Sequence, residues 1–231
     1  MSEQQVFYNK DQKYAVIDNA VPHNTFVEFQ EFMMSNVPEW TIGTKTASPD
    51  LYVNKTAKGF KHYQPARDLN NIQGNVILLA DSLQTIYFGN PNDIFIARTQ
   101  LYQPFMNALV QYLNPLSLIR LKVNVTFNSS EVVELGYHQD RVSETGEFDH
   151  MMNACFYLNT CDGYTRFLDK DGKPGDKVES VANRLVYFPN SVKHAGTTTS
   201  NEKARYVVNI NYVPRLKCPF HEFLGKEFML N

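Results

Sequence analysis

The stretch Arg120–Phe127, RLKVNVTF, alternates polar and apolar residues at every position. In an extended chain, one face would carry leucine, valine and phenylalanine, and the opposite face would carry lysine, asparagine and threonine. A period of two is typical of a β-strand that buries one face. The stretch therefore predicts a strand, and the strand-like pattern begins at about Leu118.

Further strand-like runs follow toward the C-terminus. They cover residues 153–159, 164–168, 184–188 and 205–213, with turn residues such as Asp162-Gly163 between them. Several short strands separated by turns favour a sandwich or barrel of the jelly-roll type.

The first half of the chain shows a helical period instead. Apolar residues from Phe26 to Met33 recur at spacings of three and four, behind cap-forming residues at 22–25. A second helix is predicted from about Ile96 to Leu113, ending at Asn114-Pro115. We expect both helices to pack on the outside of one sheet, which makes the fold class α+β.

Composition limits the function further. The chain has 231 residues, 43% hydrophobic and 20% charged, which predicts a folded protein rather than a disordered one. The net charge of -2 provides no general attraction to nucleic acid or to an anionic membrane. We find no internal repeat, no membrane-spanning run and no signal peptide, and the three cysteines match no zinc pattern. We therefore expect a single cytoplasmic domain over residues 1–231.

Three residues form a candidate metal site. His138 and Asp140 lie two apart, so an extended chain would point both side chains to the same face. His194 follows a later strand-like run and is the third candidate ligand. Two imidazoles and one carboxylate leave coordination positions open, as non-haem Fe(II) oxygen chemistry requires. A bare His-X-Asp is common by chance, so spacing alone leaves a solvated or core role open.

A polar strand face supplies a second candidate. Alternation from Arg205 to Tyr212 places Arg205 on the same face as Asn209 and Asn211. A guanidinium buried there would need an anion, and a dicarboxylate could bind it in bidentate fashion. Pairing of Arg205 with Glu202 at the surface is the alternative. Lys203 has the same strand parity and competes for the same role.

The order and spacing of these motifs resemble the Fe(II)- and 2-oxoglutarate-dependent dioxygenases of the prolyl-4-hydroxylase-like branch, including phage and marine bacterial types. The resemblance covers roughly residues 118–214. Its marks are Tyr137-His138-Gln139-Asp140, Ala154-Cys155-Phe156-Tyr157-Leu158-Asn159, Asp162-Gly163-Tyr164-Thr165-Arg166-Phe167, Asn183-Arg184-Leu185-Val186-Tyr187-Phe188-Pro189, and His194-Ala195-Gly196 with Arg205.

The resemblance implies a double-stranded β-helix, with Fe(II) bound by His138, Asp140 and His194 as the catalytic centre. It implies that Arg205 pairs with the distal carboxylate of 2-oxoglutarate and that Tyr157 adds a hydroxyl to the same carboxylate. Thr165 would line the cosubstrate pocket. The implied reaction hydroxylates a C–H bond, in a prolyl 4-hydroxylase-like manner, and yields succinate and CO2, with ascorbate as reductant.

The substrate is not readable from the sequence. A peptidyl proline, another protein side chain and a small metabolite all remain open, while neither a membrane nor a nucleic acid is indicated. We expect residues 1–117 to form a helical, substrate-side part that includes His62-Tyr63, residues 118–214 the catalytic jelly roll, and residues 215–231 a C-terminal tail. The alternative function is a non-catalytic jelly-roll module for binding or structure.

Overall fold

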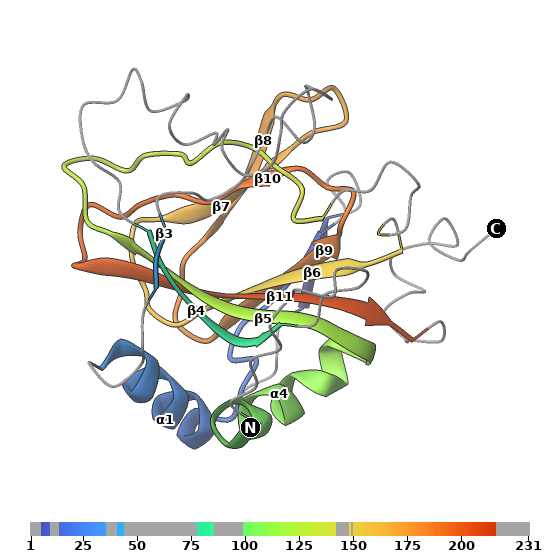
Figure 1. Cartoon of the computed structure of the whole chain (residues 1–231). Helices are drawn as coiled ribbons and strands as arrows, with labels where there is room; N and C mark the ends of the chain where they lie inside the picture. Colours follow the sequence, from blue (N-terminus) through green and yellow to red (C-terminus); the bar gives the residue numbers. More distant parts are fainter. Residues whose placement is uncertain are drawn as a thin grey trace.

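The computed structural model describes residues 6–9, 14–35, 41–43, 78–85, 99–141, 148 and 150–215, and the statements below concern these residues. Within them, two antiparallel sheets face each other, and two helices cover the outer side of the larger sheet (Figure 1). This arrangement confirms the α+β jelly roll with helices on one sheet.

The larger sheet has eight strands in the order β1-β2-β9-β6-β11-β5-β4-β3. Its central strands are long and fully paired: β11 lies between β5 and β6 along most of its length. The strand bounds are β1 Val6–Asn9, β2 Tyr14–Ile17, β3 Thr41–Gly43, β4 Leu78–Thr85, β5 Pro115–Phe127, β6 Met152–Tyr157, β9 Arg184–Pro189 and β11 Ala204–Pro214.

The smaller sheet has three strands in the order β10-β7-β8. They are β7 Tyr164–Leu168, β8 Pro174–Glu179 and the short β10 His194–Ala195. The helices are α1 His23–Met34 and α4 Thr99–Leu113. Both run beneath the larger sheet, on the side away from the smaller one (Figure 1).

Two hydrophobic clusters hold these layers together. One lies between the helices and the larger sheet, where Phe105 of α4 stacks on Phe29 of α1 and meets the edge of the Phe156 ring from β6. The other lies between the two sheets, where Phe167 stacks on Tyr14. The inner faces of both sheets point into this space between them, so a polar residue on either inner face is enclosed by protein.

The predicted elements agree with the structure where it describes them. Both predicted helices are present, and each predicted strand run coincides with an observed strand within a few residues. The predicted capping of the first helix is wrong in its chemistry: Pro22 occupies the N-cap with extended backbone, and no side chain caps the helix. The strands β1, β2, β3, β4, β8 and β10 were not predicted.

Candidate active site

The two candidate histidines are fixed to each other through their backbones. His138 donates its N–H to the carbonyl of His194 at 2.9 Å, and His194 returns the bond at 3.0 Å. This isolated antiparallel bridge joins the segment after β5 to β10 of the smaller sheet. The ring centroids consequently lie 4.6 Å apart although the residues are far apart in sequence.

Asp140 completes a compact set of metal-binding atoms. Its Oδ1 lies 3.4 Å from Nε2 of His138 and 3.7 Å from Nε2 of His194. The ligand atoms of the three residues all lie within 4.8 Å of one another. Two ligand atoms that each lie about 2.0–2.2 Å from one ion, at right or tetrahedral angles, are about 3–3.6 Å apart, so the set fits a single metal.

The protonation states of this set also suit a metal. Burial alone would raise the pKa of Asp140, but its contact with His138 and the charges of His194 and Arg120 hold that pKa well below its usual range. Burial, together with the neighbouring His138, lowers the pKa of His194 to about 4, against the opposing charge of Asp140. A carboxylate and a neutral imidazole are therefore present at neutral pH, as coordination requires.

The other ring nitrogen of each histidine faces a backbone carbonyl. Nδ1 of His138 lies 3.2 Å from the carbonyl of Gly136, and Nδ1 of His194 lies 3.4 Å from that of Val192. A proton on Nδ1 leaves the lone pair of Nε2 free to bind a metal. The backbone thus orients both rings toward Asp140.

A chain of buried asparagines, which the sequence did not reveal, orients the carboxylate. Asn211 of β11 donates to Oδ2 of Asp140 at 2.7 Å and to Oδ1 of Asn153 at 2.9 Å. Asn153 of β6 donates in turn to Asn190, which accepts from the backbone N–H of Arg141. The chain ties Asp140 and the loop behind it to β11, to β6 and to the turn after β9. Only the place of Asn211 on a polar strand face was visible in the sequence.

Arg205 lies inside the protein and not at the surface. Its side chain is on β11, and the residue is only 4% exposed. Its Nε donates to Oγ of Ser180 at 2.6 Å, and its guanidinium also donates to the carbonyl of Thr197 and to Oγ1 of Thr165. No described carboxylate pairs with it, and its predicted competitor Lys203 is exposed.

Tyr157 and Thr165 meet beside this guanidinium. The Tyr157 hydroxyl donates to Oγ1 of Thr165 at 2.8 Å, and the guanidinium of Arg205 lies 5.3 Å from the Tyr157 ring. Burial raises the pKa of the Tyr157 hydroxyl, which therefore stays protonated. Thr165 lines the cavity, whereas Tyr157 is not among the described lining residues. The Tyr157 hydroxyl is therefore linked to the cavity by its hydrogen bond to Thr165, which does line it.

The absence of a side chain at Gly163 leaves space for the side chain of Arg205. A Cβ at this position would lie 2.6 Å from Cδ of Arg205 and 2.7 Å from the carbonyl oxygen of Thr198. Both distances are shorter than real Cβ contacts allow. A glycine is therefore needed here because Arg205 and the backbone of Thr198 approach this position closely.

One cavity joins the metal set to Arg205. It is lined by residues of β5, β6, β7, β10 and β11, together with residues of the segment after β5 that carries His138 and with Gly196 after β10. The lining residues are Arg120, Lys122, Asn124, Thr126, Leu135, His138, Asp140, Cys155, Thr165, His194, Gly196, Arg205, Val207 and Asn209. The sequence placed Lys122 on the polar side of a strand but gave no sign that this side faces the site.

Four other histidines remain in the chain. His23 and His150 are exposed, and His62 and His221 fall outside the described residues. Cys155 lines the cavity as a neutral thiol, because burial raises its pKa to about 12. Within the described part of the chain, no helix is long and apolar enough to cross a membrane.

Comparison with known families agrees with this geometry. Residues 125–213 match the model of the 2OG-Fe(II) oxygenase superfamily. The matched range contains His138, Asp140 and His194 as well as Arg205. The chain is therefore an Fe(II)- and 2-oxoglutarate-dependent oxygenase, which confirms the dioxygenase class recognised in its sequence, while its place in the prolyl-4-hydroxylase-like branch stays a prediction. No curated protein sequence matches the chain significantly.

Solved structures with a similar fold belong to several oxygenases. A prolyl hydroxylase from Trichoplax adhaerens, in complex with a hypoxia inducible factor peptide fragment, has a TM-score of 0.54 at 13% identity, over 87% of this chain and 84% of that one. The non-haem α-ketoglutarate-dependent epimerase SnoN of nogalamycin biosynthesis has a TM-score of 0.53 at 13% identity, over 88% and 78%. AviO1 from Streptomyces viridochromogenes Tue57 has a TM-score of 0.50 at 10% identity, over 88% and 90%. At these identities the likeness concerns the fold.

The described residues fit both groups that this class of enzyme uses. Two imidazole nitrogen atoms and one carboxylate oxygen lie within 4.8 Å of one another, which suits Fe(II) with open coordination positions. A buried guanidinium without a described carboxylate partner suits one end of 2-oxoglutarate. The cofactors of the enzyme are therefore Fe(II) and 2-oxoglutarate, as the sequence predicted.

Proposed function

We propose that this dioxygenase hydroxylates an aliphatic C–H bond of a peptide or small-molecule substrate, with His138, Asp140 and His194 holding the metal. Arg205 binds the distal carboxylate of 2-oxoglutarate. The single observation that carries these roles is the shared cavity, which has a metal-binding set at one end and a buried guanidinium without a described acidic partner at the other.

The chain's own residues prepare the site before any chemistry occurs. Ser180 and Thr165 hold the Arg205 side chain by hydrogen bonds, so its remaining N–H groups are oriented before the cosubstrate enters. Tyr157 supports this arrangement by donating to Thr165. Asn211 fixes the free oxygen of Asp140 and leaves the other oxygen facing the two histidines.

When bound, Fe(II) and 2-oxoglutarate supply the oxidising power: O2 is consumed, one oxygen atom enters the substrate, and 2-oxoglutarate leaves as succinate and CO2. The chain contributes orientation and exclusion of water. The apolar cluster between the sheets, including Phe167 and Phe188, packs around His194 and covers the back of the site.

A peptidyl proline is the first substrate to test. Support comes from a protein of similar fold, the Trichoplax adhaerens prolyl hydroxylase, which was solved with a peptide fragment. We also propose that residues 118–214 form the catalytic core, that residues 1–117 contribute the substrate side, and that 215–231 form a tail. A cytoplasmic location is supported by the free, buried Cys155 and Cys161.

The test is a substrate screen with two readouts. Proline-containing peptides and a panel of amino acids and small metabolites are incubated with enzyme, Fe(II), ascorbate, 2-oxoglutarate and air. Succinate is measured by NMR, and substrates are examined by mass spectrometry for a gain of one oxygen atom. Asp140→Ala serves as the metal-free control. If the wild type forms no more succinate than this variant with any substrate, the non-catalytic jelly-roll module becomes the better account.

A further inference from the structure

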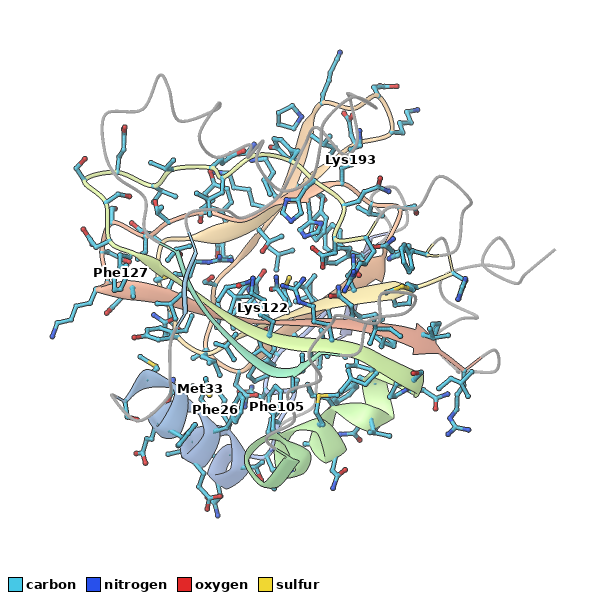
Figure 2. All side chains as sticks on the ribbon, viewed as in Figure 1. Phe26, Met33, Phe105, Lys122, Phe127 and Lys193 are labelled. Atoms are coloured by element: carbon cyan, nitrogen blue, oxygen red, sulfur yellow. The ribbon has the colours of Figure 1, made fainter. Side chains whose placement is uncertain are left out.

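Lys122 is a basic residue that lines the cavity and that the proposed function does not use. It lies on β5, on the side of the larger sheet that faces the smaller one (Figure 2). It is partly buried and pairs across the sheet with Asn209 of β11. A lysine in this place is unusual for a wall between two sheets, where apolar side chains are the rule.

The ammonium group has no partner in the described part of the chain. Within that part, no acid lies close enough to form a salt bridge with Lys122, and no side chain or carbonyl accepts a hydrogen bond from it. A charge withdrawn from water without a partner is costly, and a bound anion would remove that cost. Nearby Asn124 likewise has a buried Oδ1 without a partner.

The distal carboxylate of 2-oxoglutarate is too far away to be that ligand. Arg205, which binds it in our proposal, pairs across the sheet with Thr126. Lys122 comes four residues before Thr126 on β5, which puts about 13 Å between the Cα atoms of Lys122 and Thr126. The lysine is therefore at the metal end of the cavity and not at the Arg205 end.

The charges in the loaded site leave Lys122 uncompensated. The described charged residues that line the cavity are Arg120, Lys122, Asp140 and Arg205. Fe(II) and doubly ionised 2-oxoglutarate cancel each other, and Asp140 and Arg205 do the same. The charge of Lys122 remains even when Arg120, which has other contacts, is set aside.

We propose that Lys122 recognises an anionic group, a carboxylate or a phosphate, on the substrate to be oxidised. This inference rests on the proposed function and narrows its substrate class to anionic molecules or acidic side chains. An anion bound by Lys122 would lie beside Asp140 and the metal, and it would hold the neighbouring C–H bonds of the substrate near the open coordination positions. Arg120, adjacent on the same strand face, adds positive potential.

The test measures anion binding to protein loaded with Mn(II) and N-oxalylglycine, the unreactive analogue of 2-oxoglutarate. Acetate, methyl phosphate and the neutral acetamide are titrated at constant ionic strength, and binding is followed by calorimetry and thermal melting. The variants are Lys122→Met, which keeps the apolar length without the charge, and Lys122→Arg, which keeps the charge. Lys203→Met, at an exposed position of the same chain, is the matched control.

We expect acetate or methyl phosphate to bind the wild type, Lys122→Arg and Lys203→Met at least tenfold more tightly than Lys122→Met. The anion with the larger difference identifies the substrate group as carboxylate or phosphate, and acetamide should bind all four proteins equally. Equal anion binding by the wild type and Lys122→Met would overturn the inference.

A control titration separates this inference from the proposed function. The Kd of 2-oxoglutarate, measured with Mn(II), should be the same in the wild type and in Lys122→Met. If that Kd rises tenfold or more in Lys122→Met, the lysine belongs to the cosubstrate site and the inference is wrong while the proposed function stands. If the wild type itself binds no 2-oxoglutarate, the proposed function fails, and the same anion titration of the unloaded wild type and Lys122→Met then decides whether Lys122 binds an anion.

Discussion

Replacing Asn211 by alanine should weaken metal binding although Asn211 is not a ligand. Its amide holds one oxygen of Asp140 at 2.7 Å, while the other oxygen faces the two histidines. Without that bond the carboxylate can rotate, and the buried Oδ1 of Asn153 loses a donor at 2.9 Å. Metal ligands that lose such a partner typically lose ten- to a hundredfold in affinity. We expect the same for Mn(II), which corresponds to about 1.4–2.8 kcal/mol.

The assay is calorimetric titration of Mn(II) into apo wild type, Asn211→Ala and Asn107→Ala. Asn107 is exposed on α4, so its variant controls for the loss of an asparagine as such. Circular dichroism and thermal melting establish that each variant is folded. The free energy of unfolding should also fall in Asn211→Ala, since an unsatisfied buried acceptor costs about 1–3 kcal/mol. A folded Asn211→Ala that binds Mn(II) with wild-type Kd would refute the positioning role.

Three further predictions concern the cosubstrate end and the cavity charge. Tyr157→Phe removes the bond to Thr165 and should raise the 2-oxoglutarate Kd only severalfold, since a neutral hydrogen bond contributes about 0.5–1.5 kcal/mol; an unchanged Kd in calorimetry would return Tyr157 to a purely packing role. Gly163→Ala should push the Arg205 side chain aside and weaken 2-oxoglutarate binding at least tenfold while the affinity for Mn(II) is kept. Parallel titrations of both ligands check this, and an unchanged 2-oxoglutarate Kd would contradict it. Burial and the charge of Arg120 lower the pKa of Lys122 to about 7, so between pH 7 and its ordinary value the unfolded chain binds a proton that the folded apo protein lacks. The free energy of unfolding should therefore rise with pH in that window, and a rise of equal size in Lys122→Met, measured by denaturant titration, would contradict the assignment.

The periodic parts of the fold could be predicted because they follow from local sequence. The polar alternation on β11 placed Arg205 and Asn211 on one face, and both point inward as that pattern requires. The spacing of His138 and Asp140 likewise put two candidate ligands on one side. Such patterns depend only on neighbours two residues apart, which a sequence displays directly.

Features that depend on distant partners could not be predicted. Asn153, Asn190 and Asn211 form one chain of hydrogen bonds although they lie 37 and 58 residues apart. Each is an ordinary asparagine in the sequence. Strand β8, PGDKVE, has a mostly polar composition and is a strand only because it pairs with β7. Tertiary pairing overrides weak local preference in both cases.

The most direct test of the central claim is to titrate metal and cosubstrate separately into three proteins: the wild type, Asp140→Ala and Arg205→Ala. The account predicts that the wild type binds one Mn(II) and then 2-oxoglutarate. Asp140→Ala should lose metal and, with it, cosubstrate binding, since 2-oxoglutarate in this account needs both ends of the cavity. Arg205→Ala should keep wild-type metal affinity but lose at least tenfold in 2-oxoglutarate affinity. Wild-type metal binding by Asp140→Ala, or wild-type 2-oxoglutarate binding by Arg205→Ala, would contradict the account.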